Sequence, residues 1–68
     1  MNAELQASEK LRQLLKENDL TQEEFSELFG IDVRTCNRFI NEGITKVATL
    51  EELATFFNIQ IKEFFEED

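Results

Sequence analysis

The sequence lacks histidine, proline, tryptophan and tyrosine, and its 68 residues include one cysteine and two glycines. Without histidine there is no imidazole base, no imidazole metal ligand and no ready proton switch near neutral pH. The lone Cys36 cannot form an intrachain disulfide, so we expect a reducing, cytoplasmic location. Without proline the usual helix breaker is missing. These absences exclude a disulfide-stapled scaffold, a collagen and a linker.

Long apolar runs and basic residues are also scarce. No stretch approaches the ~18 apolar residues of a membrane span, and the polar segment Met1–Glu9 is not typical of a secretory signal, so we expect no membrane contact. Seven Lys and Arg residues against fifteen Asp and Glu residues give a net charge of -8. Because nucleic-acid binders usually show a basic patch, the position of these cations matters more than the total.

Apolar residues recur at three- and four-residue spacing, which is the pattern of amphipathic helices. No segment of useful length alternates between apolar and polar residues with a period of two, which is the pattern of a β-strand. We therefore predict an all-α fold, a single compact domain over residues 1–68 with five short helices. The apolar stripes of these helices are Leu11, Leu14 and Leu15; Phe25, Leu28 and Phe29; Cys36, Phe39 and Ile40; Leu50, Leu53, Ala54 and Phe57; and Ile61, Phe64 and Phe65.

Capping residues mark the second and third helices. Thr21 is a predicted N-cap whose capping box is completed by Glu24. Gly30 ends this helix, because glycine adopts the left-handed conformation without steric cost. Asp32 is the predicted N-cap of the next helix, after a very short turn. Two capped helices joined in this way predict a helix-turn-helix over residues 21–43.

The third helix is predicted to carry a polar face opposite its apolar stripe. The second helix of a helix-turn-helix presents its outer face to the DNA major groove. At ~100° per residue, that outer face comprises Arg34, Asn37, Arg38 and Asn41, with Val33 and Thr35 at its N-terminal edge.

These residue types suit base recognition. Arginine can donate two hydrogen bonds to guanine, asparagine can pair with adenine or bind a phosphate, and valine or threonine can contact the thymine methyl. Residues 33–41 contain two arginines and no acid. Alternatively, both arginines pair with surface glutamates, and Asn41 is a helix C-cap.

The C-terminal part predicts a capped helix and a dimer contact. Thr49 and Glu52 match a capping box, and the stripe of Ile61, Phe64 and Phe65 predicts a dimerisation helix over residues 60–67. Phe56 falls outside its helix stripe, so we expect an aromatic patch at a dimer interface. The alternative is that Phe56 closes one end of the core.

The stretch TQEEFSELFGIDVRTCNRF, followed by NEG and TLEELATFFNIQIKEFF, resembles the phage Cro/repressor-type helix-turn-helix family over about residues 11–65. The strongest matches are residues 20–24 and 29–31, Thr35 and Asn41. This resemblance implies a five-helix domain whose second and third helices read DNA and whose last helix pairs two subunits. It also implies phosphate contacts from Gln22 and Asn41, base contacts from Val33, Arg34 and Arg38, and an aliphatic core position at Cys36.

Two departures from the family pattern affect DNA contacts. Ile40 stands where many members have glutamate, and Glu42 is inserted before Gly43. The following loop carries Lys46 where relatives often have several cations, so fewer phosphate contacts are expected. We expect Cys36 to be a small core residue, with a redox sensor as the alternative.

Together these features predict a sequence-specific, repressor-like regulator that binds double-stranded DNA at a palindromic operator as a homodimer. Gln22, Asn41 and Lys46 would hold phosphates, while Arg34, Arg38 and Val33 would read bases. The alternative is an acidic protein-interaction module on the same fold, acting as an antirepressor, a DNA mimic or an antitoxin-like partner. No catalytic site, metal or cofactor is expected.

Overall fold

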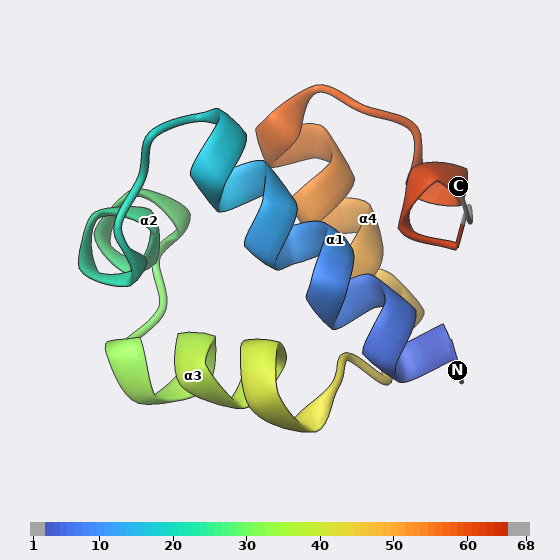
Figure 1. Cartoon of the computed structure of the whole chain (residues 1–68), viewed down its shortest axis with the longest axis horizontal. Helices are drawn as coiled ribbons and strands as arrows, with labels where there is room; N and C mark the ends of the chain where they lie inside the picture. The colour runs from blue at the N-terminus through green and yellow to red at the C-terminus, as the bar shows by residue number, and fades with distance from the viewer. Residues whose placement is uncertain (1–2, 66–68) are drawn as a thin grey trace.

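The computed structural model describes residues 3–65, which form four α-helices and one short 3-10 helix (Figure 1). Their bounds are Ala3–Glu17 (α1), Gln22–Phe29 (α2), Val33–Glu42 (α3), Val47–Phe57 (α4) and Ile61–Phe64 (η1). The predicted all-α class is confirmed. Within the described residues no helix is long and apolar enough to cross a membrane.

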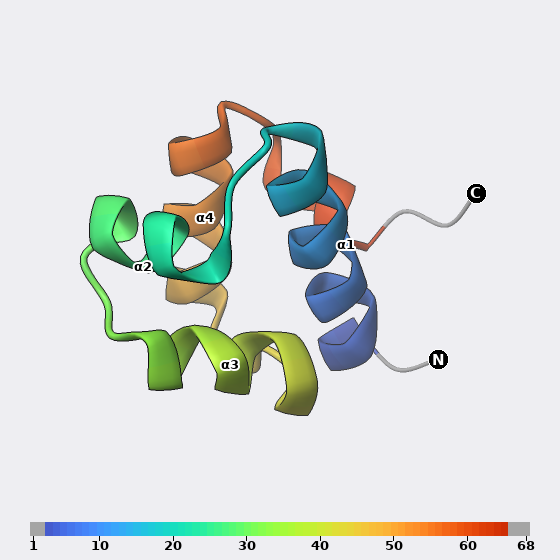
Figure 2. The same ribbon diagram turned by 60° about the vertical axis from the view of Figure 1, so that its left-hand side comes forward.

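The core lies between α1 and α4, and α3 crosses one end of this pair (Figures 1 and 2). Phe25 of α2 is fully buried and stacks on Phe29 and Phe57, with ring centroids 5.1 and 5.7 Å apart. Phe56 meets Phe25 edge-on at 5.3 Å. Phe56 is half-buried in this cluster. Its burial favours the alternative in which Phe56 closes one end of the core, and not the one in which it forms an exposed aromatic patch.

The predicted ends of α2 and α3 are confirmed. The Glu24 amide donates to Thr21 Oγ1 at 3.0 Å, and the Thr21 amide donates to Glu24 Oε1 at 2.9 Å. Gly30 has a φ of 89°, and the next amide, that of Ile31, donates to the Ser26 carbonyl at 2.9 Å. This left-handed residue turns the chain sharply, so α3 can begin three residues after Gly30.

Two expectations about α2 and α4 are wrong. Leu28 is 67% exposed, whereas Ser26 is buried, because the inward side of α2 is centred between Phe25, Ser26 and Phe29 and leaves Leu28 about a quarter turn away. The capping box that starts at Thr49 does not form at the helix start. Instead α4 begins at Val47, with the Thr49 amide donating to the Lys46 carbonyl at 3.1 Å.

The predicted fifth α-helix over residues 60–67 is also wrong, although residues 66 and 67 lie outside the described residues. The segment forms the single 3-10 turn η1, with the Gln60 amide donating to Glu63 Oε2 at 3.1 Å. Phe64 is 1% exposed and packs in the core, contrary to its expected dimer contact. Since i and i+3 eclipse in a 3-10 turn, Ile61 lies above Phe64 and is itself half-buried.

Adjacent phenylalanines in this turn give a matched test of the packing. Phe64→Ala should lower the free energy of unfolding by about 3–5 kcal/mol, because it leaves a cavity between η1, α1 and α4. Phe65→Ala, at a side chain that is 41% exposed, should cost about 1 kcal/mol or less. Urea unfolding followed by circular dichroism measures both values. Similar losses in the two variants would contradict the burial of Phe64, and Phe64→Leu provides an intermediate case if the alanine variant does not fold.

Candidate nucleic-acid interface

The outer face of α3 is open to solvent along its length. Arg34, Asn37, Arg38 and Asn41 are all exposed, and Val33 is partly exposed, while Thr35 is half-buried at the edge. On the opposite side Cys36 and Ile40 are buried. The predicted separation of a polar outer face from an apolar inner face is therefore confirmed, and α3 lies at one edge of the molecule (Figure 2).

A pair of small buried side chains holds α3 against α2. Cys36 is fully buried and lies against Ser26, which is 2% exposed and donates a hydrogen bond to the Gln22 carbonyl at 2.7 Å. Burial raises the pKa of the Cys36 thiol, outweighing the opposing hydrogen bond with Ser26. A neutral, inaccessible thiol has the properties of a core residue, which agrees with the expectation that Cys36 is a small core residue and not a redox sensor.

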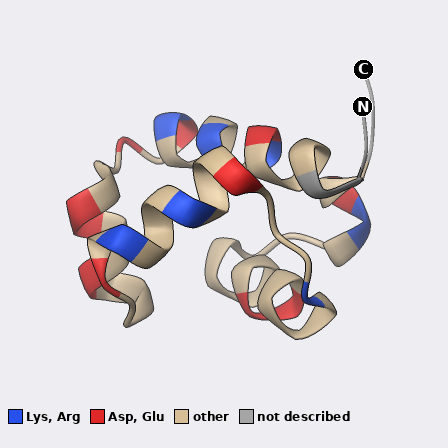
Figure 3. Ribbon diagram, turned by 90° about the horizontal axis from the view of Figure 1, so that it is seen from below, with Lys and Arg blue, Asp and Glu red and all other residues tan. Residues whose placement is uncertain are grey.

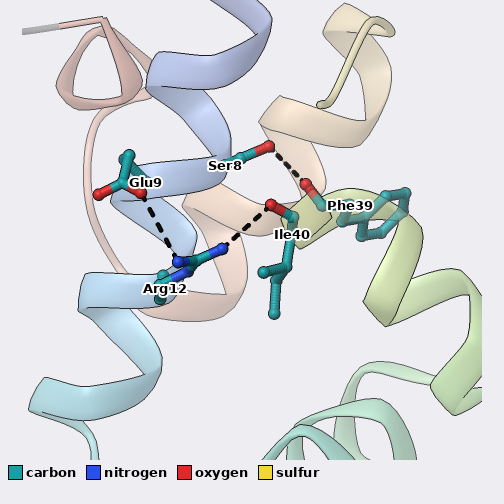
Figure 4. Close-up of polar contacts among 5 residues, drawn as sticks. All are labelled: Ser8, Glu9, Arg12, Phe39 and Ile40. Atoms are coloured by element: carbon teal, nitrogen blue, oxygen red, sulfur yellow. Dashed lines mark hydrogen bonds and ion pairs between the residues drawn. The ribbon is translucent and has the colours of Figure 1, made fainter. Parts of the chain in front are cut away.

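Helix α1 holds the other end of α3 through main-chain carbonyls. The last four carbonyls of an α-helix lack partners within the helix. Ser8 Oγ donates to the Phe39 carbonyl, and Arg12 Nη2 donates to the Ile40 carbonyl at 3.5 Å (Figure 4). Arg12 also lies 3.8 Å from a Glu9 carboxylate oxygen. These contacts fix the angle at which α3 leaves the core, and they join residues about thirty positions apart, which sequence spacing does not reveal.

The charges on α3 are largely free to interact with a ligand. Arg38 Nε lies 3.9 Å from Glu42 Oε1, and both side chains are about two-thirds exposed. Such a pair contributes only about 0–1 kcal/mol, so an anionic ligand group could replace the carboxylate at little cost. The alternative in which Arg38 pairs with a surface glutamate is thus present as a weak contact. Along α3, Figure 3 shows two blue bands separated by tan and then one red band, as expected from Arg34, Arg38 and Glu42 in its sequence.

A groove next to α3 brings Gln22 and Asn41 together. It lies between the second half of α1, the start of α2 and the end of α3, with a volume of about 410 Å³. Its polar lining also includes Arg12 and Lys16, one turn apart on α1. The N-terminal amides of α2 and its dipole favour an anion at this end of the helix. Two cations and two amide side chains thus give the groove the chemistry of a phosphate site.

Arg12 and Lys16 are candidate site residues that the sequence pattern did not point to. Their i, i+4 spacing on the polar face of the first helix was the available signal, but only the folded chain places them near α3. Lys46 does not line this groove and precedes α4 as its N-cap. Asn41 is not a C-cap, because α3 continues through Glu42 and ends at Gly43.

The fold and the exposed α3 face define a helix-turn-helix domain. Residues 11–64, which are most of the chain, match the sequence model of a protein family described as helix-turn-helix. The protein belongs to this family, of the Cro/repressor, lambda-repressor-like type, and the resemblance found from the sequence is confirmed. It is a family of DNA-binding domains and not typically one of enzymes. No curated protein and no solved structure matches the chain.

The N-cap of α3 can be tested through its pH dependence. Asp32 Oδ1 accepts a hydrogen bond from the Thr35 amide at 2.7 Å. Hydrogen bonding from the Thr35 side chain and from its amide, with a smaller effect of Arg34, holds the pKa of Asp32 below its usual value. A lowered folded-state pKa gives stability that is present above the unfolded pKa and is lost as pH falls through the folded pKa.

Accordingly, Asp32→Ala should lower the melting temperature at neutral pH, and its difference from the wild type should shrink below about pH 4. Asp32→Asn keeps a capping oxygen without a titrating group, so it should retain most of the neutral-pH stability. Thermal unfolding from pH 3 to 7 measures all three proteins. A wild-type advantage over Asp32→Ala that stays constant across this range would show that the charged cap is not formed.

Proposed function

We propose that this protein is a sequence-specific transcriptional regulator of the repressor type, which inserts α3 into the major groove of double-stranded DNA. The observation that carries the proposal is the exposed α3 face, with two arginines and two asparagines on a chain of net charge -8. Since most of the surface repels phosphate, attraction is concentrated on α3 and on the adjacent groove. A duplex therefore has one favoured orientation of approach.

The position of each residue suggests whether it would contact bases or phosphates. Arg34 and Val33 lie in the first turn of α3, and Arg38 lies one turn later on the same side, so these three would contact base edges. Gln22, Asn41, Arg12 and Lys16 would hold the DNA backbone in the groove beside α3, with Lys46 as a further phosphate contact. Asn37 on the same outer face and Thr35 at its edge would make further contacts with the DNA.

A homodimer would complete this arrangement on a palindromic operator. Two α3 helices related by a two-fold axis would read half-sites about 34 Å apart. Phe65 is 41% exposed and Ile61 is half-buried, so these two residues are the candidates for the subunit contact, while Phe64 serves the core. The chain would act in the cytoplasm, where its single thiol stays reduced.

Selection of bound duplexes from a random library tests the proposal directly and supplies the preferred site. On that site Arg34→Ala should lose roughly 1–3 kcal/mol of binding free energy while binding to unrelated DNA is nearly unchanged. Lys16→Ala should weaken both kinds of DNA alike and reduce the salt slope by about 0.9. Anisotropy titrations at several salt concentrations separate the two effects.

Failure of the wild type to bind any duplex at low salt would overturn the proposal and favour the acidic protein-interaction module. An equal loss on all sequences for Arg34→Ala would show instead that this arginine contacts only the backbone.

Glu42 gives a second test of DNA binding through charge. Glu42→Gln removes the carboxylate beside Arg38 and should tighten DNA binding by up to about fivefold at low salt, in keeping with a surface pair of about 0–1 kcal/mol. Glu51→Gln on α4 makes the same change in net charge away from α3 and should have a smaller effect. Equal effects of the two variants would show that net charge alone, not the α3 face, determines affinity.

A further inference from the structure

Helices α2 and α4 form a second surface to which α3 contributes no residue. An open groove of about 440 Å³ is lined by Leu28 and Phe29 of α2 and by Glu51, Glu52, Thr55 and Phe56 of α4. Phe29 and Phe56 meet edge-on, with ring centroids 5.6 Å apart, and both are half-buried. Leu28 stands beside them with 67% of its surface exposed. The groove thus offers an apolar floor and one largely unburied leucine.

The charge around this groove has one sign. The two helices carry five glutamates and neither carries a lysine or an arginine, as the red bands without blue on α2 and α4 show in Figure 3. Glu51 and Glu52 line the groove itself, and Glu24 lies one helical turn before Leu28. An apolar centre with an acidic rim fits a partner that is apolar at its centre and basic at its edges.

We propose that this groove binds a basic amphipathic segment of another protein, which places an apolar side chain against Leu28, Phe29 and Phe56 and its cations against Glu51 and Glu52. DNA does not fit, because its phosphates would face carboxylates. A second copy of this chain related by two-fold symmetry would set the same glutamates opposite one another, which costs free energy. The groove shares no lining residue with the groove that contains Gln22 and Asn41, so the partner and a DNA duplex would contact different residues.

The test uses the whole chain and a synthetic amphipathic helical peptide of leucine and lysine as the probe, with a leucine–glutamate peptide as its negative counterpart. In an NMR titration the amides of Leu28, Thr55 and Phe56 should shift with the lysine peptide and not with the glutamate peptide. Leu28→Glu should then weaken binding about tenfold or more. A purely electrostatic attraction predicts the opposite, because this variant adds a negative charge.

Val47→Glu is the matched control. Val47 is 63% exposed at the start of α4 and does not line the groove, so its substitution makes the same charge change and should leave peptide binding equal or tighter. A double variant, Glu51→Gln with Glu52→Gln, should weaken binding without altering the apolar floor. DNA binding of all variants, measured in parallel, distinguishes a failure of this inference from a failure of the proposed function.

Any of three titration results would overturn the inference: peptide binding that Leu28→Glu leaves unchanged or strengthens, equal losses in Leu28→Glu and Val47→Glu, or shifts that map outside the groove. A dimer in sedimentation that Leu28→Glu converts to a monomer would also overturn it, because the groove would then be occupied by a second copy.

Discussion

The interface depends on how α3 is held, because a recognition helix must keep a fixed angle while its outer face stays free of protein contacts. Its inner face is fixed by burial, with Cys36 against Ser26 and with Ile40 in the core. Its C-terminal end is fixed by hydrogen bonds from Ser8 and Arg12 of α1 to main-chain carbonyls. Both constraints act on the side of α3 away from solvent, so the arginines and asparagines remain available to a ligand.

The acidic composition is compatible with DNA binding because charge is unevenly divided among the helices. Arg12 and Lys16 of α1 line the groove that contains Gln22 and Asn41, and Arg34 and Arg38 lie exposed on α3. The carboxylates of α2 and α4 surround a different, apolar groove. At physiological salt, fields from exposed charges fade within about 8 Å, so each groove responds mainly to its own residues. One small domain can therefore offer a surface for an anionic ligand and another for a cationic one.

Much of the helix-turn-helix was predictable because its determinants are local. The hydrogen bonds between Thr21 and Glu24 and between Asp32 and Thr35 join residues three positions apart. The turn at Gly30 needs only a residue that tolerates a positive φ. The polar face of α3 follows from helical spacing alone. The wrong predictions concern side chains whose burial depends on residues that are close in space but distant in the chain. Leu28 fits the stripe of α2 but lies off its packed side, and Phe64 lies in a turn too short to form a helix of its own.

The sequence by itself determined the all-α class, the boundaries of α2 and α3, and which α3 residues face outward, since capping and periodicity act within a few residues of the chain. Tertiary structure alone decided that Arg12 and Lys16 join Gln22 and Asn41, that α1 donates to the end of α3, and that Phe64 belongs to the core. Those outcomes depend on contacts between residues far apart in the chain, which form only when the apolar faces of all the helices are buried together.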